Sequence, residues 1–255
     1  MEYLRYWSLR EPPFGPAASR FFFLGSPQRE TLSWIQDLAV GDGKTGLIAA
    51  RSGCGLTSLF QRVSQSCGFD DCATEVVLTN GRHPSVERVH NDLAGAMGVI
   101  AKRNSLSAVS TALDDLNRKS IHAVWLIDGL GKHSADAVLQ VNRKCPSLTV
   151  IGSVTPRLQR LVSRSLGKRI AQTSLPAFEI PETRAFIAHS MQTAGCRTEP
   201  FSDEALNEIH RLSEGRIGMI SRIGRVALMF TARHGIKQAT VRDIQVAADN
   251  AQYAA

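Results

Sequence analysis

The stretch that decides the fold is GLIAARSGCGLTSLFQRV, from Gly46 to Val63. It joins an apolar run to a Gly-rich turn and then to a segment whose apolar residues recur at helical spacing. A strand, a turn of glycines and a helix N-terminus together present successive backbone N–H groups to an anion. The stretch therefore predicts a strand at 45–50, a helix at 56–67 and a phosphate-binding loop between them.

The loop follows the pattern G-x-x-x-x-G-K-[ST] with two departures. Ala50 stands in place of the first glycine, and Leu56 stands in place of the lysine that contacts phosphates. The second glycine is present, and the residue that would coordinate Mg²⁺ is Thr57. The candidate nucleotide-binding residues are Ser52, Gly53, Cys54, Gly55, Leu56, Thr57 and Ser58.

The rest of the chain up to about Phe178 alternates short apolar runs with helix-length segments. Strands are predicted at 45–50, 74–80, 122–128, 147–154 and 169–175. Helices are predicted at 56–67, 84–99, 105–118, 134–143 and 156–166. Several strands are almost continuously apolar, as is typical of parallel strands covered on both faces. The fold class is therefore α/β, with a doubly wound, five-stranded parallel sheet.

After Phe178 the strand pattern stops, and helical periodicity continues to the last residues. Helices are predicted within 180–195, 202–212, 217–235 and 240–252, the last with a capping-box-like start at Thr240 and Asp243. We therefore expect a small C-terminal helical domain. The predicted organisation is an N-terminal segment at 1–35 that packs on the core, a core domain at 36–178 and a helical domain at 179–255.

The amino-acid composition excludes few classes of function. The chain has 255 residues, 43% of them hydrophobic, and a net charge of +7. Positive charge favours nucleic acid, an anionic membrane surface or nucleotide phosphates, although a plain solvated basic surface explains it equally well. No apolar run approaches the roughly 20 residues that span a bilayer, and the first residues lack an apolar signal core, so we expect a cytoplasmic protein. The five cysteines show no paired spacing and are expected to be plain thiols.

A second motif lies in AVWLIDGLGKH, residues 123–133, where an apolar strand ends in Asp128. A carboxylate at this place suits Mg²⁺ held through water. The next residue is Gly129, where hydrolytic proteins of this kind carry an acid that polarises the attacking water. A strand-terminal aspartate can also be a helix cap or a turn residue.

Further stretches resemble one family nearly end to end. YWSLREPPFGPAASRFFFLGSPQRETLSWI, residues 6–35, is similar to the opening of the AAA+ ATPases of the general secretion pathway protein A group. That group is related to pilus-biogenesis and transposition ATPases. LPAFEIPETRAFIAHSMQTAG, residues 175–195, and FSDEALNEIHRLSEGRIGMIS, residues 201–221, resemble its helical lid. The matching residues of the opening are Trp7, Pro13, Phe14, Phe22 and Arg29.

The resemblance implies an AAA+ core, a lid, ATP or ADP with Mg²⁺, and assembly with other subunits, but key residues differ. The lid run G-x-P-R-x-I-N falls on residues 215–221, so the phosphate-sensing arginine becomes Gly218. Ser153 after the fourth strand and Arg216 near the lost arginine are candidate sensors. Lys44 and Arg51 are the other cations that could substitute, although surface charge explains all three cations.

A basic stripe on the predicted helix 156–166 completes the set of candidate residues. Arg157, Arg160, Arg164 and Lys168 recur at spacings of three and four. The resemblance implies that Arg160 and Arg164 act as an arginine finger toward a neighbouring subunit's nucleotide. A plain basic helix face, or one that contacts DNA, is an equal alternative.

Three hypotheses follow. The first is an AAA+-like regulatory, adaptor or assembly subunit of a secretion, pilus or envelope-related system. We expect it to bind ATP weakly or not at all, with any residual binding favouring ADP. Losing one electrostatic stabiliser costs about 10²–10³ in rate, and Leu56, Gly129 and Gly218 remove three. The alternatives are a slow ATPase that uses relocated basic residues and a DNA-binding accessory protein of the transposition type.

Overall fold

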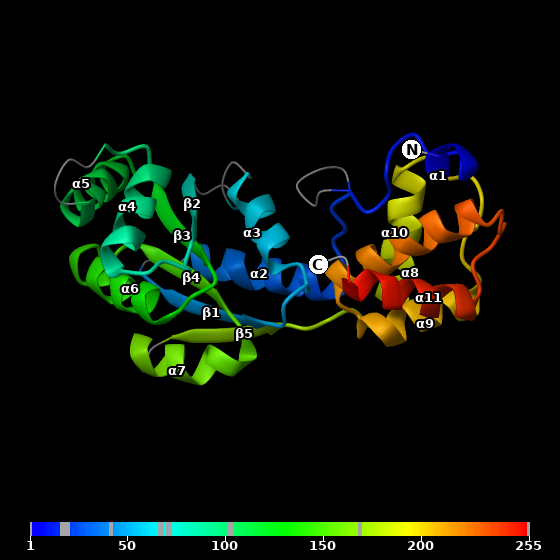
Figure 1. The fold of residues 1–255 in the computed structure, drawn as a ribbon. Helices are drawn as coiled ribbons and strands as arrows, with labels where there is room; N and C mark the ends of the chain where they lie inside the picture. Colours follow the sequence, from blue (N-terminus) through cyan, green and yellow to red (C-terminus); the bar gives the residue numbers. More distant parts are fainter. Residues whose placement is uncertain are drawn as a thin grey trace. The chain divides into compact units, whose positions relative to one another are not determined.

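The computed structural model describes residues 2–15, 21–40, 43–65, 69, 73–100, 105–167 and 170–253. Contacts between Cα atoms divide the chain into two units, and each is described by itself (Figure 1). One unit holds the sheet and comprises Gln28–Arg51 and Leu59–Leu175. The other is helical and comprises Met1–Pro27, Ser52–Ser58 and Pro176–Ala255.

The sheet unit contains one five-stranded sheet in the order β2-β3-β4-β1-β5, and every pairing in it is parallel. The predicted α/β class and the parallel sheet are confirmed. The fourth strand begins two residues later than expected, because Leu148 still belongs to a turn in which its N–H donates to the Cys145 carbonyl. The strands are β1 (Thr45–Ala50), β2 (Thr74–Asn80), β3 (His122–Asp128), β4 (Thr149–Val154) and β5 (Ala171–Leu175).

Helices cover both faces of this sheet, as a doubly wound fold requires. On one face, side chains of α4, α5, α6 and α7 form a buried cluster with strand residues such as Leu47 and Trp125. Gly46 points to the opposite face, where α2 lies so close that a Cβ on Gly46 would stand 2.4 Å from Leu38 Cδ2. The helices are α2 (Ser26–Ala39), α3 (Leu56–Ser64), α4 (Val86–Ala96), α5 (Ser105–Arg118), α6 (Lys132–Lys144) and α7 (Pro156–Leu166).

The helical unit is built from α1 (Glu2–Tyr6), α8 (Ile180–Thr193), α9 (Asp203–Ser213), α10 (Ile217–Arg233) and α11 (Val241–Tyr253). Its helix starts follow the expected capping chemistry. The Ser202 hydroxyl accepts a hydrogen bond from the Ala205 N–H at 3.1 Å, and the Asp243 carboxylate accepts one from the Thr240 N–H at 2.8 Å. The C-terminal helical domain is therefore present as predicted.

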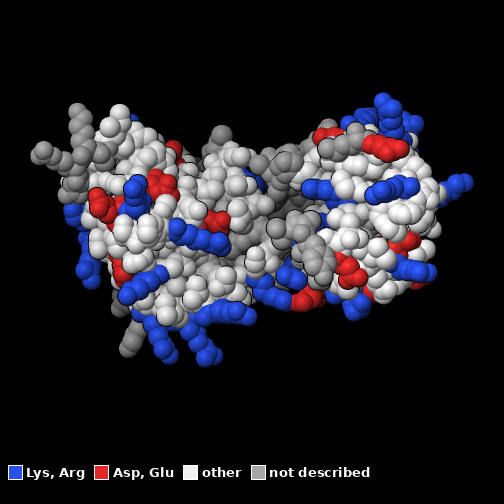
Figure 2. All heavy atoms as spheres, in the orientation of Figure 1, with Lys and Arg blue, Asp and Glu red and all other residues white. Residues whose placement is uncertain are grey.

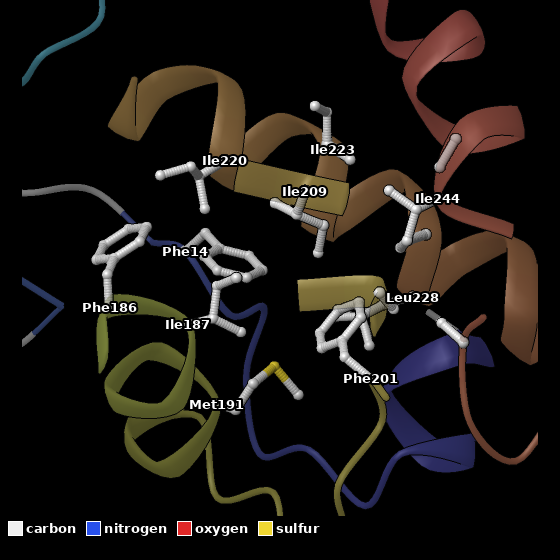
Figure 3. Close-up of a cluster of buried hydrophobic side chains, with 14 of the residues drawn as sticks. Phe14, Phe186, Ile187, Met191, Phe201, Ile209, Ile220, Ile223, Leu228 and Ile244 are labelled. Carbon is white, nitrogen blue, oxygen red and sulfur yellow. The ribbon is translucent and has the colours of Figure 1, made fainter. Parts of the chain in front are cut away.

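The first residues of the chain pack with these helices, which corrects the expectation that residues 1–35 pack on the sheet domain. Figure 3 shows Phe14 among side chains of α8 and α10. The Trp7 indole N–H donates to the Leu228 carbonyl at 3.0 Å, and both residues are buried. The aromatic residues of the N-terminal segment find their apolar partners on the helical domain, and only the chain from Gln28 onward belongs to the sheet unit.

Candidate nucleotide-binding site

The loop between β1 and α3 keeps the backbone form that a phosphate-binding turn needs. Gly53 and Gly55 have φ values of +86° and +92°, a region that side-chain-bearing residues rarely adopt. Ser52 and Thr57 are exposed, whereas Cys54 is buried. The glycines therefore shape a turn directly before the N-terminus of α3, where backbone N–H groups and the helix dipole attract an anion.

Leu56, the residue in the lysine position, is the first residue of α3 and is buried, with 6% of its surface exposed. Leu59 and Phe60, which follow it on the same helix, are fully buried. The residue in the lysine position is therefore a buried apolar side chain. No cation stands at this position to meet the β- and γ-phosphates of a nucleotide.

The loop also contacts the start of α10 within the helical unit. The Gly218 N–H donates to the Gly53 carbonyl at 2.9 Å. A Cβ placed on Gly55 would lie 3.0 Å from Ile217 Cδ1, and one placed on Gly218 would lie 3.4 Å from Gly53 Cα. The position of the family's sensor arginine is therefore in direct backbone contact with the loop.

Arg216 is the predicted relocated cation, and the structure places it beside this loop. A Cβ on Gly53 would lie 3.8 Å from Arg216 Cβ, and Arg216 is the N-cap residue of α10. Its guanidinium Nε donates to the Ser213 carbonyl at 3.1 Å. The start of the Arg216 side chain thus lies beside the loop, while its guanidinium is held by the Ser213 carbonyl. Lys44 and Arg51, the other two predicted substitutes, are exposed.

The carboxyl ends of β3 and β4 bring together two other predicted residues. The Ser153 hydroxyl donates to Asp128 Oδ1 at 2.7 Å, and the Gly129 N–H donates to the Ser153 Oγ at 2.7 Å. A hydroxyl has one proton to donate, and Ser153 gives it to Asp128. In this geometry Ser153 orients the carboxylate and has no proton left for a phosphate oxygen.

Gly129 occupies the position of the missing water-polarising acid, and an arginine side chain lies against it. Gly129 has a φ of +86°, and a Cβ placed on it would lie 2.8 Å from Arg82 Nε and 3.1 Å from Arg82 Cγ. The Gly81 N–H donates to the Asp128 carbonyl at 2.8 Å, which holds the chain after β2 against the end of β3. A cation therefore lies at the position where the resemblance described above predicts an acid.

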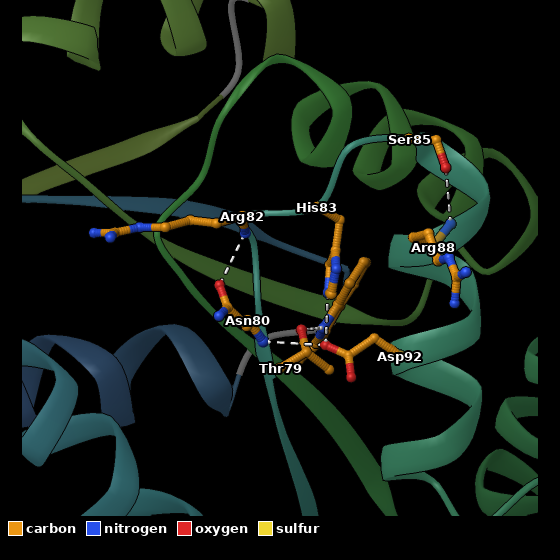
Figure 4. A network of polar contacts seen from close by, with 8 residues as sticks. Thr79, Asn80, Arg82, His83, Ser85, Arg88 and Asp92 are labelled. Atoms are coloured by element: carbon orange, nitrogen blue, oxygen red, sulfur yellow. Dashed lines mark hydrogen bonds and ion pairs between the residues drawn. The ribbon is translucent and has the colours of Figure 1, made fainter.

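Arg82 was not among the residues predicted from the sequence, although its position after β2 at the carboxyl edge of a parallel sheet was a usable signal. Figure 4 shows how its segment is held. The Arg82 N–H donates to Asn80 Oδ1 at 2.9 Å. The Asp92 carboxylate of α4 accepts from the Asn80 N–H at 3.2 Å and lies 3.0 Å from His83 Nε2. These contacts fix the backbone from which Arg82 extends.

For several predicted site residues, the described part of the chain shows no contact that bears on the predicted role. Thr57 belongs to the helical unit and Asp128 to the sheet unit, so their shared Mg²⁺ site stays a prediction. Arg157, Arg160 and Arg164 are exposed on α7. Lys168, Cys67 and Cys72 lie outside the described residues. Within the described part of the chain, no group of three or more His, Cys, Asp or Glu side chains is arranged to hold a metal, and no helix is long and apolar enough to cross a membrane.

Comparisons with known proteins agree with the geometry. No protein-family model matches the chain. The general secretion pathway protein A of Aeromonas hydrophila is 24% identical over 270 aligned positions, which cover 96% of this chain and 48% of that protein. The chain therefore spans about half the length of this curated relative.

Solved structures extend the likeness to the fold. The ORC1 protein of Aeropyrum pernix in complex with DNA has a TM-score of 0.63 at 16% identity, over 88% of this chain and 64% of that one. The Thermotoga maritima RuvB Holliday junction branch migration motor has a TM-score of 0.58 at 16% identity, over 89% and 69%. The chain has the AAA+ P-loop fold and is similar to general secretion pathway protein A.

The AAA+ fold implies a nucleotide with Mg²⁺, and the residues present fit this group only in part. The loop glycines and the N-terminus of α3 offer backbone donors to phosphate, Thr57 is exposed, and Asp128 supplies a carboxylate. The side-chain cations of the family's lysine and sensor arginine are absent from their positions. A phosphate here would rest on the backbone N–H groups of the loop and of the α3 N-terminus.

Proposed function

We propose that this AAA+ protein works as a regulatory, adaptor or assembly subunit that does not turn over ATP. One observation carries the proposal. At each of the three positions where the family carries a catalytic residue, this chain has a different residue that is buried or packed against its neighbours. Leu56 is buried at the start of α3, Gly129 lies under the Arg82 side chain, and Gly218 packs on the loop backbone.

The expected loss of activity is large. Phosphoryl transfer leaves the protein little to do except position groups and stabilise charge. Removing one such stabiliser commonly costs about 3–4 kcal/mol, and losses within one functional unit do not simply add. At the end of β3 the change is a reversal of charge, because the Arg82 guanidinium lies where the family's carboxylate would be. Ordinary ATP hydrolysis is not expected from this arrangement.

Nucleotide binding is expected to be weak and to favour the diphosphate. Backbone N–H groups and the α3 dipole attract phosphate without any lysine. Leu56 supplies no positive charge to offset the γ-phosphate. The lack of a lysine should therefore weaken the binding of ATP more than the binding of ADP. Thr57 and Asp128 are the proposed Mg²⁺ ligands.

The proposed setting follows from the similarity to general secretion pathway protein A. We place the protein in a secretion, pilus or envelope-related system, in contact with other AAA+ subunits or with further protein partners. Arg160 and Arg164 are exposed on α7 and are proposed as residues that complete a neighbouring subunit's nucleotide site.

The test combines a steady-state ATPase assay with calorimetric titration of ATP and ADP in the presence of Mg²⁺. We expect phosphate release at the level of the buffer, the same in wild type and in Asp128→Asn, and weaker binding of ATP than of ADP. Asp128→Asn keeps the shape of the side chain and removes its charge, so it is a matched control. Turnover by the wild type that disappears in this variant would show an active enzyme.

A slow ATPase is the second candidate, and the position of Arg216 beside Gly53 is the observation in its favour. In that case Arg216→Ala abolishes a measurable wild-type turnover. A DNA-binding accessory role is the third, supported by the net charge of +7 and by the likeness to an ORC1 protein solved with DNA. Its signature is a duplex affinity that falls steeply as salt is raised.

A further inference from the structure

Helix α7 combines a buried side with an unusual exposed side. Val162 and Leu166 lie in the core of the sheet unit. The exposed side carries two leucines, Leu158 and Leu161, with 43% and 53% of their surface open to solvent. The same side carries the three arginines already described, and the helix contains no Asp or Glu: its sequence is PRLQRLVSRSL.

The arginines and leucines form one continuous face. At 3.6 residues per turn, Arg157, Arg160 and Arg164 form a stripe, and Leu161 and Leu158 follow beside it, all within an arc of about 160°. We call these five residues the α7 face. Figure 2 shows Lys and Arg side chains gathered over α7.

The α7 face is fixed in its outward orientation. Gln172 of β5 donates through Nε2 to Ser163 Oγ at 3.2 Å, and it accepts through Oε1 from Gln159 Nε2, also at 3.2 Å. These bonds join α7 to the edge strand of the sheet. With Val162 and Leu166 buried as well, the helix cannot rotate its leucines inward without breaking its own packing.

We propose that the α7 face is a peripheral binding site for an anionic lipid surface. Both parts of the face match such a surface. Arginines near a negatively charged leaflet each add about fivefold to the affinity, and exposed leucines gain by entering the boundary between headgroups and acyl chains. The 11 residues of α7 lie with their length along the surface, so all five side chains reach it together.

The two exposed leucines, Leu158 and Leu161, favour a lipid surface over nucleic acid as the partner of the α7 face. A phosphate backbone is bound through charge and hydrogen bonds and offers little apolar surface to two leucine side chains. The uncharged polar side chains of α7 are already engaged, since Gln159 and Ser163 bond to Gln172, and Ser165 donates to the Leu161 carbonyl. This binding does not depend on the nucleotide loop, and it is an alternative to the role of Arg160 and Arg164 at a neighbouring subunit's nucleotide, because a guanidinium at a lipid surface cannot contact that nucleotide as well.

The experiment uses the whole chain and vesicle flotation at fixed salt. The vesicles are either pure phosphatidylcholine or an equimolar mixture with phosphatidylglycerol. One variant removes the charge by Arg157→Ala, Arg160→Ala and Arg164→Ala together. A second removes the apolar part by Leu158→Ser with Leu161→Ser. The matched control is Met229→Ser with Arg233→Ala, an exposed apolar and basic pair one turn apart on α10.

We expect binding to the anionic vesicles and none to pure phosphatidylcholine. The arginine variant should lose about 100-fold in affinity, the leucine variant about 10-fold or more, and the control less than about twofold. Far-ultraviolet circular dichroism checks that each variant is folded. The same proteins are also titrated onto a short DNA duplex.

Three results overturn the proposal. They are an absence of binding to the anionic vesicles, a loss in the control equal to that in the α7 variants, and a leucine variant that binds vesicles like wild type. In the last case, tighter binding to the duplex with the same dependence on the arginines assigns the face to DNA instead.

Discussion

A substitution at Gly129 tests whether the position of the lost acid is still available to a side chain. Two features oppose any residue with a Cβ there. The φ of +86° is a conformation that costs other residues about 1–3 kcal/mol, and the new Cβ would stand 2.8 Å from Arg82 Nε. Because Arg82 is exposed and flexible, moving it is cheap, and the backbone supplies most of the cost.

Gly129→Ala should therefore lower the free energy of unfolding by about 1–3 kcal/mol. At about 2–4 °C per kcal/mol for a chain of this size, thermal unfolding followed by circular dichroism should shift down by about 2–12 °C. Gly95→Ala is the matched control, because Gly95 lies in α4 with nothing within 4 Å of a new Cβ. That variant should gain up to about 1 kcal/mol from helix propensity.

The same reasoning predicts that Gly129→Glu alone does not restore hydrolysis. The new carboxylate starts next to the Arg82 guanidinium and pairs with it, so it is not free to polarise water. Adding Arg82→Ala removes the partner and leaves the backbone cost. A Gly129→Ala protein as stable as wild type, or as stable as Gly95→Ala, would refute the argument that this position is closed.

Three further predictions concern other sites. Leu56→Lys should cost about 1.5–3 kcal/mol of stability in urea unfolding, because a buried leucine is lost, and calorimetry should show tighter binding of ATP with Mg²⁺. Unchanged affinity would mean that the loop no longer holds a phosphate. The hydrogen bonds from Arg211 lower the pKa of Glu208 from 4.5 to about 2. Its contribution to stability is therefore complete above pH 4.5 and is lost as the pH falls toward 2; urea unfolding of Glu208→Gln should lack this part of the pH dependence. Trp7→Ala should destabilise the helical unit by about 3–5 kcal/mol, and an effect below about 1 kcal/mol would contradict the packing of the N-terminal segment on it.

Local patterns were sufficient to predict the fold and the loop. The strands at 45–50, 74–80 and 122–128 have the predicted bounds, because each has a central apolar run, such as VVL in 76–78 and AVWLI in 123–127, with polar residues beside it. Gly53 and Gly55 were predictable because the turn needs residues that tolerate a positive φ. These features depend on residues that are neighbours in the sequence.

The features that were missed depend on contacts between distant segments. The apolar pattern of residues 2–14 indicates burial but not the partner, and Trp7 bonds to Leu228, 221 positions away. Arg82 reads as an ordinary surface residue until the parallel register sets Asn80 beside Asp128 and brings the chain after β2 to Gly129. The sequence places Arg82 after a strand at the carboxyl edge of the sheet, but its contact with Gly129 follows only from the register of β2 and β3.

Under the proposed function, three positions lack the residue that the family carries there, and their contacts rank how easily each could accept it. Gly218 is the easiest to revert, since it lies in the first turn of α10 and a new Cβ would be 3.4 Å from Gly53 Cα, an ordinary contact. Leu56 is harder, because a lysine there gives up a buried apolar side chain. Gly129 is the hardest, because its φ of +86° disfavours residues that carry a Cβ. In the proposed function the two easier positions serve nucleotide binding and the hardest serves hydrolysis, so we expect substitutions at Leu56 and Gly218 to raise nucleotide affinity more readily than any substitution at Gly129 produces turnover.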